Sequence, residues 1–345
     1  MIILDEKGWM CMKKPERIFV IGHKNPDTDS ICSAIAYADI KNRTTQSKRY
    51  IPKRAGQINE ETRYVLNRFG VQPPAYLGNI GTQVKDMDIR TSPQADKNMS
   101  LKNTWDLMQE NGIVSLPIRD KDGCLEGLVT IGDIAKTYMD TTDSYLLSRA
   151  RTQYQRIAET IGGKVIEGNA HGYFIQGKIM VATANPDKMK EYVEENDMVI
   201  MGNREEDHLQ AIEQNVSCII VGMGIEVTEK VLKLAHEKEI IIISSPYDTF
   251  TISRLINQSI PVSYVMKRDN MVTFNTEDFT DDIQDVMIKH RHRAFPVINK
   301  RGKCVGTISR RNFLDMHKKQ VILVDHNEKD QAVDNIEKAE ILEII

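Results

Sequence analysis

The chain has 345 residues, of which 41% are hydrophobic and 28% are charged, and its formal net charge is −3 at pH 7. This length exceeds the roughly 100–200 residues of a single domain, so we expect two or three domains, and the composition excludes a disordered or fibrous chain. The slightly acidic balance gives no basis for sequence-independent nucleic-acid binding, which needs a basic surface.

The cysteines and the longest apolar runs bear on the cellular location. Five cysteines are scattered and never form a C-x-x-C pair, which fits neither a disulfide framework nor a structural zinc site: Cys11, Cys32, Cys124, Cys218 and Cys304. No apolar run approaches the roughly 20 residues of a membrane span, and the first residues lack the order of a signal peptide. We therefore expect a cytoplasmic protein with no membrane partner and no nucleic-acid partner.

The first predicted strand, residues 17–22, runs directly into a polar cluster. His23, Asp27 and Asp29 follow it and precede a helix that is expected to begin near Ser30. One imidazole and two carboxylates form a ligand set that suits Mn²⁺, Co²⁺, Mg²⁺ or Zn²⁺. The alternative is structural, with the aspartates capping the helix and His23 serving as an ordinary loop residue.

An internal repeat dominates the middle of the chain. Residues 115–134 align without gaps with residues 294–313, and helical patterns at 101–111 and 279–290 precede the two copies. Each unit therefore predicts a β-α-β-β-α module with a glycine-containing hairpin turn and a capped final helix. The register pairs Pro117 with Pro296, Gly123 with Gly302, Thr130 with Ser309, and Asp133 with Asn312.

Between the copies, residues 145–258 alternate helical and strand patterns and predict an inserted α/β domain. The last predicted strand, 320–324, ends at Asp325 and His326, although His326 alone is better explained as a loop residue. If this strand shares a parallel sheet with 17–22, everything from 80 to 318 is an insertion, and the two polar strand ends together hold two metal ions.

Three segments carry a resemblance to a known family. GHKNPDTDS at 22–30, RAGQINEETRYVLNRFG at 54–70 and VILVDHNE at 321–328 resemble the DHH domain of family II, manganese-dependent inorganic pyrophosphatases. The paired repeats resemble CBS domains. Residues 145–258 resemble a DRTGG domain, although NREED at 203–207 departs from the motif that names it. The arrangement is similar to that of the nucleotide-regulated pyrophosphatases with inserted CBS and DRTGG domains.

The resemblance implies an α/β fold in which a partial DHH-type parallel-sheet domain is interrupted by a CBS domain pair and an inserted α/β DRTGG domain. The expected boundaries are 15–75 for the first part of the DHH domain, 80–140 for CBS repeat 1, 145–258 for the DRTGG-like domain, 260–318 for CBS repeat 2 and 319–345 for the second part of the DHH domain.

The activity implied by the resemblance is that of an inorganic diphosphatase, which hydrolyses pyrophosphate to two phosphates. It assigns a site with two Mn²⁺ or Co²⁺ ions, and Mg²⁺ accompanying the substrate. His23 and Asp27 are then ligands of one metal, Asp29 of the other, and Asp325 of both. Family members continue with an Asp-His-His-Arg motif, so we expect the chain to be truncated before it and to have low or no activity by itself.

The CBS pair implies regulation by AMP, ADP, ATP or diadenosine polyphosphates, and a homodimer built through paired CBS modules. The expected nucleotide contacts are Thr130, Asp133, Arg293, Phe295, Ser309 and Asn312. For Phe295 a core position is an equal alternative, and Arg310 is either a basic cleft residue or the start of a solvated helix. Met87, Met266 and Trp105 are expected to pack rather than to bind.

Two other functions remain open. The first is that of another DHH phosphoesterase, acting on polyphosphate or short nucleotides. The second is that of a stand-alone adenine-nucleotide-sensing module without catalysis. The segments at 54–70 and 321–328 favour the pyrophosphatase.

Overall fold

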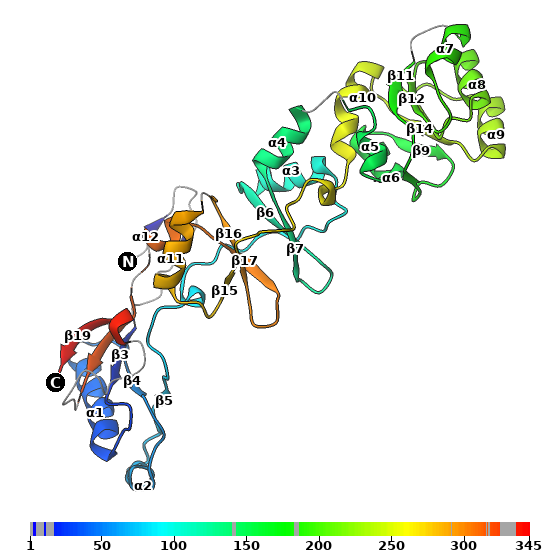
Figure 1. Ribbon diagram of the computed structural model, residues 1–345. Coiled ribbons are helices and arrows are strands. Elements are labelled where there is room, and N and C mark those ends of the chain that lie inside the picture. Colours follow the sequence, from blue (N-terminus) through cyan, green and yellow to red (C-terminus); the bar gives the residue numbers. More distant parts are fainter. Residues whose placement is uncertain are drawn as a thin grey trace. The chain divides into compact units, whose positions relative to one another are not determined.

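The computed structural model describes residues 3–4, 10–11, 17–139, 143–182, 186–290, 292–314, 316, 318–324 and 336–345. The chain divides into two compact units. Figure 1 shows the chain coloured by residue number from the N-terminus to the C-terminus. The first unit comprises residues 1–89, 274–292 and 309–345, and the second comprises residues 90–273 and 293–308. Within the described ranges, none of the helices combines the length and the apolar character that crossing a membrane requires.

The first unit is built on a five-stranded sheet with the order β19-β18-β3-β4-β5, in which all neighbouring strands are parallel. In the pairing of β18 with β3, Gln320 lies opposite Ile18 and Leu323 lies opposite Ile21. The expectation that residues 17–22 and 320–324 share one parallel sheet is therefore confirmed. The strands are β3 (Ile18–Ile21), β4 (Tyr50–Arg54), β5 (Ala75–Tyr76), β18 (Gln320–Leu323) and β19 (Glu340–Ile344).

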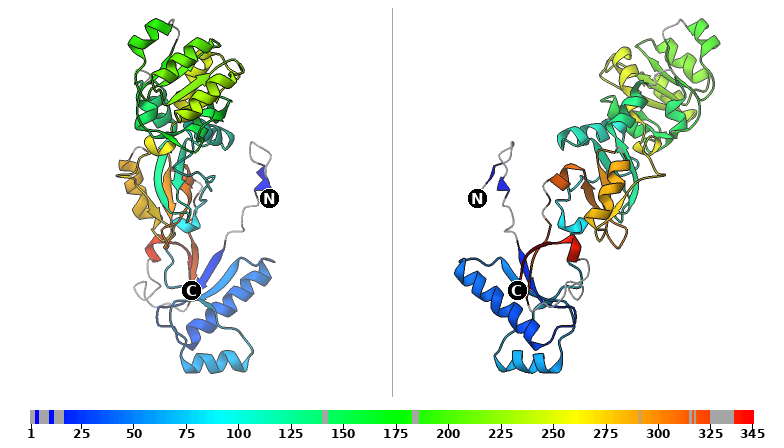
Figure 2. Two further views of the ribbon diagram at one scale, coloured as in Figure 1. Left: turned by 90° about the vertical axis from the view of Figure 1, so that its right-hand side faces the viewer. Right: turned by 60° about the vertical axis from the view of Figure 1, so that its left-hand side comes forward.

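Helix α1 (Thr28–Thr44) covers one face of this sheet, as the views in Figure 2 show for the blue helix. Its buried residues include Ala34 and Ala38, whose small side chains let the helix approach Val20 and Ile322 closely. On the opposite face Ile21, Val321 and Leu323 pack with Ile80. The central strands β3 and β18 are buried on both faces of the sheet, as is typical of parallel strands.

The remaining elements of the first unit are short, apart from two helices. They are β1 (Ile3–Leu4) and β2 (Met10–Cys11), α2 (Glu60–Arg68), η1 (Val84–Asp86), β15 (Phe274–Asn275), α11 (Thr280–Lys289), α12 (Arg311–Leu314) and η5 (Ile336–Lys338).

The second unit contains the hairpins of both repeats. Strands β6 (Ser115–Arg119) and β7 (Leu125–Thr130) pair antiparallel, as do β16 (Phe295–Ile298) and β17 (Cys304–Ile308). The turn glycines Gly123 and Gly302 have φ values of 85° and 75°, a left-handed conformation that side chains with a Cβ rarely adopt. The predicted hairpins with glycine turns are confirmed. The helices of repeat 1 in this unit are α3 (Leu101–Glu110) and α4 (Ile131–Met139).

The amino-terminal segment of each repeat pairs with the hairpin of the other repeat. Leu128 and Lys267 exchange two backbone hydrogen bonds of 2.9 Å, and Arg90 and Thr307 exchange bonds of 3.0 and 2.9 Å. The two repeats are therefore interleaved rather than simply consecutive.

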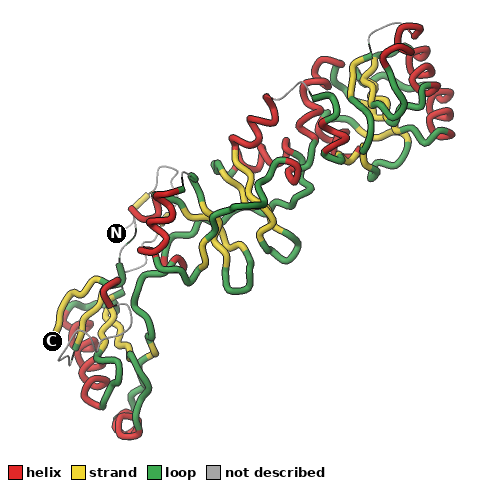
Figure 3. The backbone as a smooth tube through the Cα atoms, in the orientation of Figure 1, coloured by secondary structure: helices red, strands yellow, loops and turns green. Residues whose placement is uncertain are grey.

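The inserted domain has a sheet with the order β11-β12-β13-β14-β9, in which only β9 is antiparallel to its neighbour. Figure 3 shows these yellow strands with red helices beside them. The α/β expectation for this domain is confirmed. The elements are α5 (Leu146–Arg149), β8 (Thr152–Gln153), α6 (Tyr154–Thr160), β9 (Lys164–Glu167), β10 (Tyr173–Phe174), β11 (Ile179–Val181), α7 (Pro186–Tyr192), β12 (Met198–Met201), α8 (Glu205–Glu213), β13 (Cys218–Val221), α9 (Glu229–Glu237), β14 (Ile241–Ser244), α10 (Thr249–Leu255) and η2 (Ile256–Ser259). The short helix η3 (Val262–Tyr264) follows in the second repeat.

Candidate functional site

The turn between β3 and α1 places the predicted metal ligands at the carboxyl end of the sheet. Asp27 is the N-cap of α1, and its Oδ1 accepts a 2.9 Å hydrogen bond from the Ser30 backbone N–H. A Cβ at Gly22 would lie 1.8 Å from Ser30 Oγ and 3.0 Å from Ser30 Cβ, so a larger residue there would require the Ser30 side chain to shift. The capping role proposed as the alternative for Asp27 is present in the structure.

The same carboxylate lies beside the imidazole of His23. The distance from His23 Nε2 to Asp27 Oδ1 is 3.5 Å, and the two side chains are 22% and 61% exposed. Asp29, in the first turn of the helix, instead accepts a 3.3 Å hydrogen bond from the Ser33 hydroxyl. The structure thus brings His23 and Asp27 together in an accessible position, while Asp29 Oδ1 contacts its own helix.

Asp325, the fourth predicted ligand, lies outside the described residues. The end of the strand before it is bound to β3, because the Val324 N–H donates a 3.0 Å hydrogen bond to the Ile21 carbonyl. Among the residues that the structure describes, no group of three or more His, Cys, Asp or Glu side chains is placed to hold a metal ion.

The predicted nucleotide contacts at the ends of the hairpins are paired with each other. The Thr130 N–H and hydroxyl donate to Asp133 Oδ2 over 2.9 and 2.6 Å. In the second repeat the Ser309 N–H and hydroxyl donate to Asn312 Oδ1 over 2.7 and 2.8 Å. An amide thus reproduces the capping geometry of a carboxylate, and the predicted caps are confirmed in both repeats.

The two caps differ in their outer contact. Asp133 Oδ1 lies 3.4 Å from the Lys267 ammonium group, whereas Asn312 Nδ2 donates a 2.6 Å hydrogen bond to the Asp88 carbonyl. Asp88 and Lys267 are separated by the same offset as Asp133 and Asn312, so they are equivalent positions of the repeat. The sequence prediction missed Lys267, although extending the repeat offset toward the amino terminus would have found it.

Two of the other candidates have structural roles. Phe295, which the sequence analysis considered for stacking on adenine, is completely buried. It is a core residue, because neither face of its ring is accessible to a ligand. Arg310 donates to the carbonyl oxygens of Met287 and His290 at the end of α11, where a cation is favourable. Arg293 is exposed.

The residues expected to pack divide into two groups. Met87 and Met266 are buried at 8% and 7% exposure, as a packing role requires. Trp105 is 37% exposed and lines an apolar pocket of about 320 Å³ between α3 and α4.

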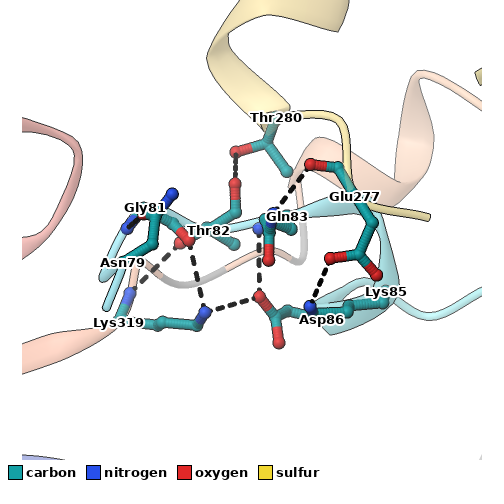
Figure 4. Close-up of polar contacts among 9 residues, drawn as sticks. All are labelled: Asn79, Gly81, Thr82, Gln83, Lys85, Asp86, Glu277, Thr280 and Lys319. Atoms are coloured by element: carbon teal, nitrogen blue, oxygen red, sulfur yellow. Dashed lines mark hydrogen bonds and ion pairs between the residues drawn. The ribbon is translucent and has the colours of Figure 1, made fainter. Parts of the chain in front are cut away.

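A polar cluster joins three distant segments of the first unit (Figure 4). Lys319, the residue before β18, has its Nζ 2.8 Å from Asp86 Oδ2 and donates to the Gly81 carbonyl over 3.2 Å. The Lys319 N–H donates to the Thr82 hydroxyl oxygen over 3.3 Å. The strand β18 is therefore fixed to the segment that leads into the first repeat.

The same segment is bonded to the start of α11. The Thr82 carbonyl accepts hydrogen bonds from the Thr280 N–H and hydroxyl over 3.0 and 3.2 Å. The Gln83 side-chain amide donates to the Glu277 carbonyl over 2.7 Å, and Lys85 Nζ lies 2.8 Å from Glu277 Oε2. The sequence prediction missed this cluster, because no local pattern indicates contacts between segments so far apart.

Comparison with known proteins identifies the domains. Residues 84–140 and 262–318 match the CBS domain family, and residues 156–259 match the DRTGG domain family. A crystal structure of the CBS and DRTGG domains of the regulatory region of Clostridium perfringens pyrophosphatase, complexed with its activator diadenosine tetraphosphate, is 34% identical. The match has a TM-score of 0.64 and covers 66% of this chain and all of that one.

Longer relatives extend the similarity to the first unit. The cobalt-dependent inorganic pyrophosphatase of Clostridium perfringens is 39% identical over 95% of this chain. A protein of Thermotoga maritima, named a probable manganese-dependent inorganic pyrophosphatase, is 33% identical over 97% of it. The chain spans 60% and 61% of the lengths of these two relatives. Over its CBS and DRTGG domains, the chain belongs to the same family as the regulatory region of the Clostridium perfringens pyrophosphatase.

Proposed function

We propose that the protein hydrolyses inorganic pyrophosphate to two phosphates at a two-metal site, under the control of adenine nucleotides that bind the CBS pair. The observation that carries this proposal is the parallel pairing of β3 with β18, in which Leu323 lies opposite Ile21. Ligand sites in open parallel sheets form beyond the carboxyl ends of the strands. His23 and Asp325 each follow one of these adjacent ends by two residues.

The donor set fits Mn²⁺ or Co²⁺, because imidazole nitrogen and carboxylate oxygen are ligands that these ions accept. His23 and Asp27 would hold one ion, Asp29 the other, and Asp325 both, with Mg²⁺ accompanying the substrate. Two bound divalent ions would stabilise the charge that develops on the phosphoryl oxygens and lower the pKa of a bound water. The chain's own contribution is to hold the imidazole of His23 3.5 Å from the Asp27 carboxylate at an accessible strand end.

Metal binding and hydrolysis test this site separately. We expect the 345-residue chain to bind Mn²⁺ in equilibrium dialysis, and His23→Ala to weaken binding by about 10–100-fold. His171→Ala, which removes an exposed histidine far from this site in the sequence, is the control and leaves binding unchanged. Phosphate release from pyrophosphate in the presence of Mn²⁺ or Co²⁺ is then measured on the same variants. Equal Mn²⁺ affinity for the wild type and His23→Ala would contradict the proposal.

We place the regulatory nucleotides, AMP, ADP, ATP or diadenosine polyphosphates, next to the two hairpin ends. Support comes from the similar regulatory region that was crystallised with diadenosine tetraphosphate. In this chain Thr130 and Asp133 supply a hydroxyl and a carboxylate, Ser309 and Asn312 supply a hydroxyl and an amide, and Arg293 is an exposed cation. These groups match phosphate and ribose hydroxyls.

Asp133→Asn separates nucleotide binding from folding. The second repeat shows that an amide preserves the cap, so the variant should fold normally. It should bind AMP more weakly, because a neutral acceptor bonds a ribose hydroxyl less strongly than a carboxylate does. Calorimetric titration with AMP measures this, and unchanged affinity would remove Asp133 from the proposed site.

We propose that the assembly is a homodimer formed through the CBS helices. Trp105, Tyr138 and Met139 on α3 and α4 are 37%, 44% and 78% exposed, and a second copy of this surface would cover them. Sedimentation at several concentrations should show a dimer for the wild type and a monomer for Met139→Glu. A wild type that remains monomeric at every concentration would refute this assembly.

A further inference from the structure

A polar pocket of about 280 Å³ lies in the second unit where the first repeat, the DRTGG domain and the second repeat come together. No acidic side chain is among the described residues that line it. Its polar lining consists of Asn98, Arg151, Gln153, Arg156, Tyr173 and Ser263.

Backbone hydrogen bonds hold the walls of this pocket. Gln153 and Tyr173 lie opposite each other in the antiparallel pairing of β8 with β10. The Ser263 N–H donates to the Lys97 carbonyl over 3.0 Å, and the Val262 N–H donates to the Met99 carbonyl over 2.8 Å. The pocket is therefore formed by ordered backbone on each side, as expected for a ligand site that exists before its ligand arrives.

The two arginines differ from other arginines of the unit. Arg149 and Arg204 form ion pairs with Asp143 and Asp207. In the part of the chain that the structure describes, the guanidinium groups of Arg151 and Arg156 have neither a hydrogen-bonding nor an ion-pairing partner.

The burial of Arg156 and the backbone conformation of Arg151 distinguish these two unpaired arginines. Arg156 is half-buried and lines the pocket, and no group among the described residues pairs with its guanidinium. Arg151 is held at φ = 52°, in the left-handed region, by a 3.0 Å hydrogen bond from its N–H to the Ser148 carbonyl. This backbone conformation is unfavourable for a non-glycine residue, so the surrounding structure must hold it in place. The position from which the Arg151 side chain extends is therefore fixed.

We propose that this pocket binds a phosphate anion and is a site distinct from the metal site and from the hairpin ends of the repeats. Two planar guanidinium groups match phosphoryl oxygens bidentately, and the Asn98 amide, the Tyr173 hydroxyl and the Ser263 hydroxyl add neutral donors. The volume is at the lower end of ligand pockets, which suits orthophosphate, pyrophosphate or the phosphate end of one nucleotide. Binding there bridges the DRTGG domain and both repeats, because all three contribute lining residues.

Equilibrium binding to the 345-residue chain tests the site. The titrations use orthophosphate, pyrophosphate, AMP and adenosine, in EDTA so that no metal-dependent binding contributes. We expect both inorganic anions to bind, and the double variant R151Q/R156Q to lose at least about tenfold in affinity. R301Q, which removes an exposed arginine of the β16–β17 turn, is the matched control and should bind like the wild type. R156K should retain part of the affinity, since it keeps the charge but not the planar fork.

The outcomes separate the sources of the phosphoryl group. If AMP alone binds, adenosine does not, and R151Q/R156Q abolishes the AMP signal, the site is supported with a nucleotide as its occupant. Unchanged affinity in R151Q/R156Q, with circular dichroism like that of the wild type, would place the anion elsewhere and overturn the proposal. Absence of binding of all three phosphates at about 10 mM would overturn it as well. His23→Ala tests the metal site alone, so failure of the proposed hydrolysis leaves this result unaffected.

Discussion

The ammonium group of Lys319 lies 2.8 Å from Asp86 Oδ2, and this contact joins the start of β18 to the helix η1 at the start of the first repeat. The two side chains are 18% and 31% exposed, so the pair is partly shielded from water. Lys319 Nζ also donates to the Gly81 carbonyl. A single cation therefore links the sheet to the segment through which the chain leaves it.

Replacement of Lys319 should weaken this junction. We expect Lys319→Met to lower the free energy of unfolding by about 1 kcal/mol, discounted for partial exposure, because the Asp86 carboxylate and the Gly81 carbonyl lose their donor. Hydrogen exchange should also accelerate at the Thr280 amide, which donates to the Thr82 carbonyl in the same cluster. Urea unfolding and exchange monitored by NMR measure the two effects.

The neighbouring pair of Lys85 with Glu277 supplies the control. Its side chains are 46% and 35% exposed, and screening by water makes such pairs worth little. Lys85→Met should therefore cost less than Lys319→Met. A larger cost for Lys85→Met would show that burial does not determine the strength of these contacts.

The two repeat caps should respond asymmetrically to exchange of their polar groups. Asp133→Asn loses only a partly exposed contact with Lys267, and we expect a change of less than about 0.5 kcal/mol. Asn312→Asp removes the donor to the Asp88 carbonyl, 2.6 Å away, and sets a carboxylate against that oxygen, which should cost about 1–2 kcal/mol.

Thermal and urea unfolding of both variants compares the two exchanges directly. Asn312→Ala, which removes the cap itself, gives the reference for a lost cap of about 1 kcal/mol. Equal costs for Asp133→Asn and Asn312→Asp would contradict the predicted asymmetry between the contacts with Lys267 and Asp88.

The elements predicted from the sequence are those specified by local or periodic patterns. The strand before His23, the glycine turns at Gly123 and Gly302 and the caps at Thr130 and Ser309 each depend on a few consecutive residues. The shared sheet of 17–22 and 320–324 followed from two similar strand ends. These patterns were sufficient because backbone hydrogen bonding and turn conformation are local requirements.

Contacts between distant segments escaped prediction. The pairs formed by Lys319 with Asp86 and by Lys267 with Asp133 exist only after the inserted domains have folded and brought these residues together. The core position of Phe295 was one of two open alternatives, because an aromatic residue in a short strand suits either a cleft or a core. Side-chain burial depends on what packs against the strand, which local sequence does not specify.

The ring of His236 on α9 should titrate above the ordinary histidine range. Its Nδ1 lies 3.0 Å from Glu167 Oε1 on β9, and this hydrogen bond raises the pKa of His236 above 6.5. A raised pKa means that the contact stabilises the fold below the unfolded pKa and is lost as the pH rises through the folded pKa. NMR titration should show Glu167→Gln lowering the midpoint toward 6.5. Glu205→Gln, on α8, should leave it in place, and an equal shift in both variants would exclude a specific contact.

The carboxylate of Glu343 on β19 should titrate in the opposite sense. The Tyr37 hydroxyl donates to Glu343 Oε2, Lys41 Nζ lies 3.2 Å from Oε1, and these bonds lower the pKa of Glu343 below 4.5. The contact therefore stabilises the fold above the unfolded pKa, and that stabilisation disappears as the pH falls through the folded value. Glu343→Gln should reduce stability at pH 7 and equal the wild type in acid.

The location of this contact makes the test informative about the sheet. Glu343 joins the edge strand to α1, so its loss should raise hydrogen exchange first at the end of β19, at the following Ile345 amide, which donates to the Leu323 carbonyl over 2.8 Å. The Ile18 amide, which donates to the Arg49 carbonyl over 2.9 Å inside the sheet, is the internal reference. Faster exchange at both amides alike would mean that the edge strand and the centre of the sheet open together, and that the side-chain contact does not govern the edge.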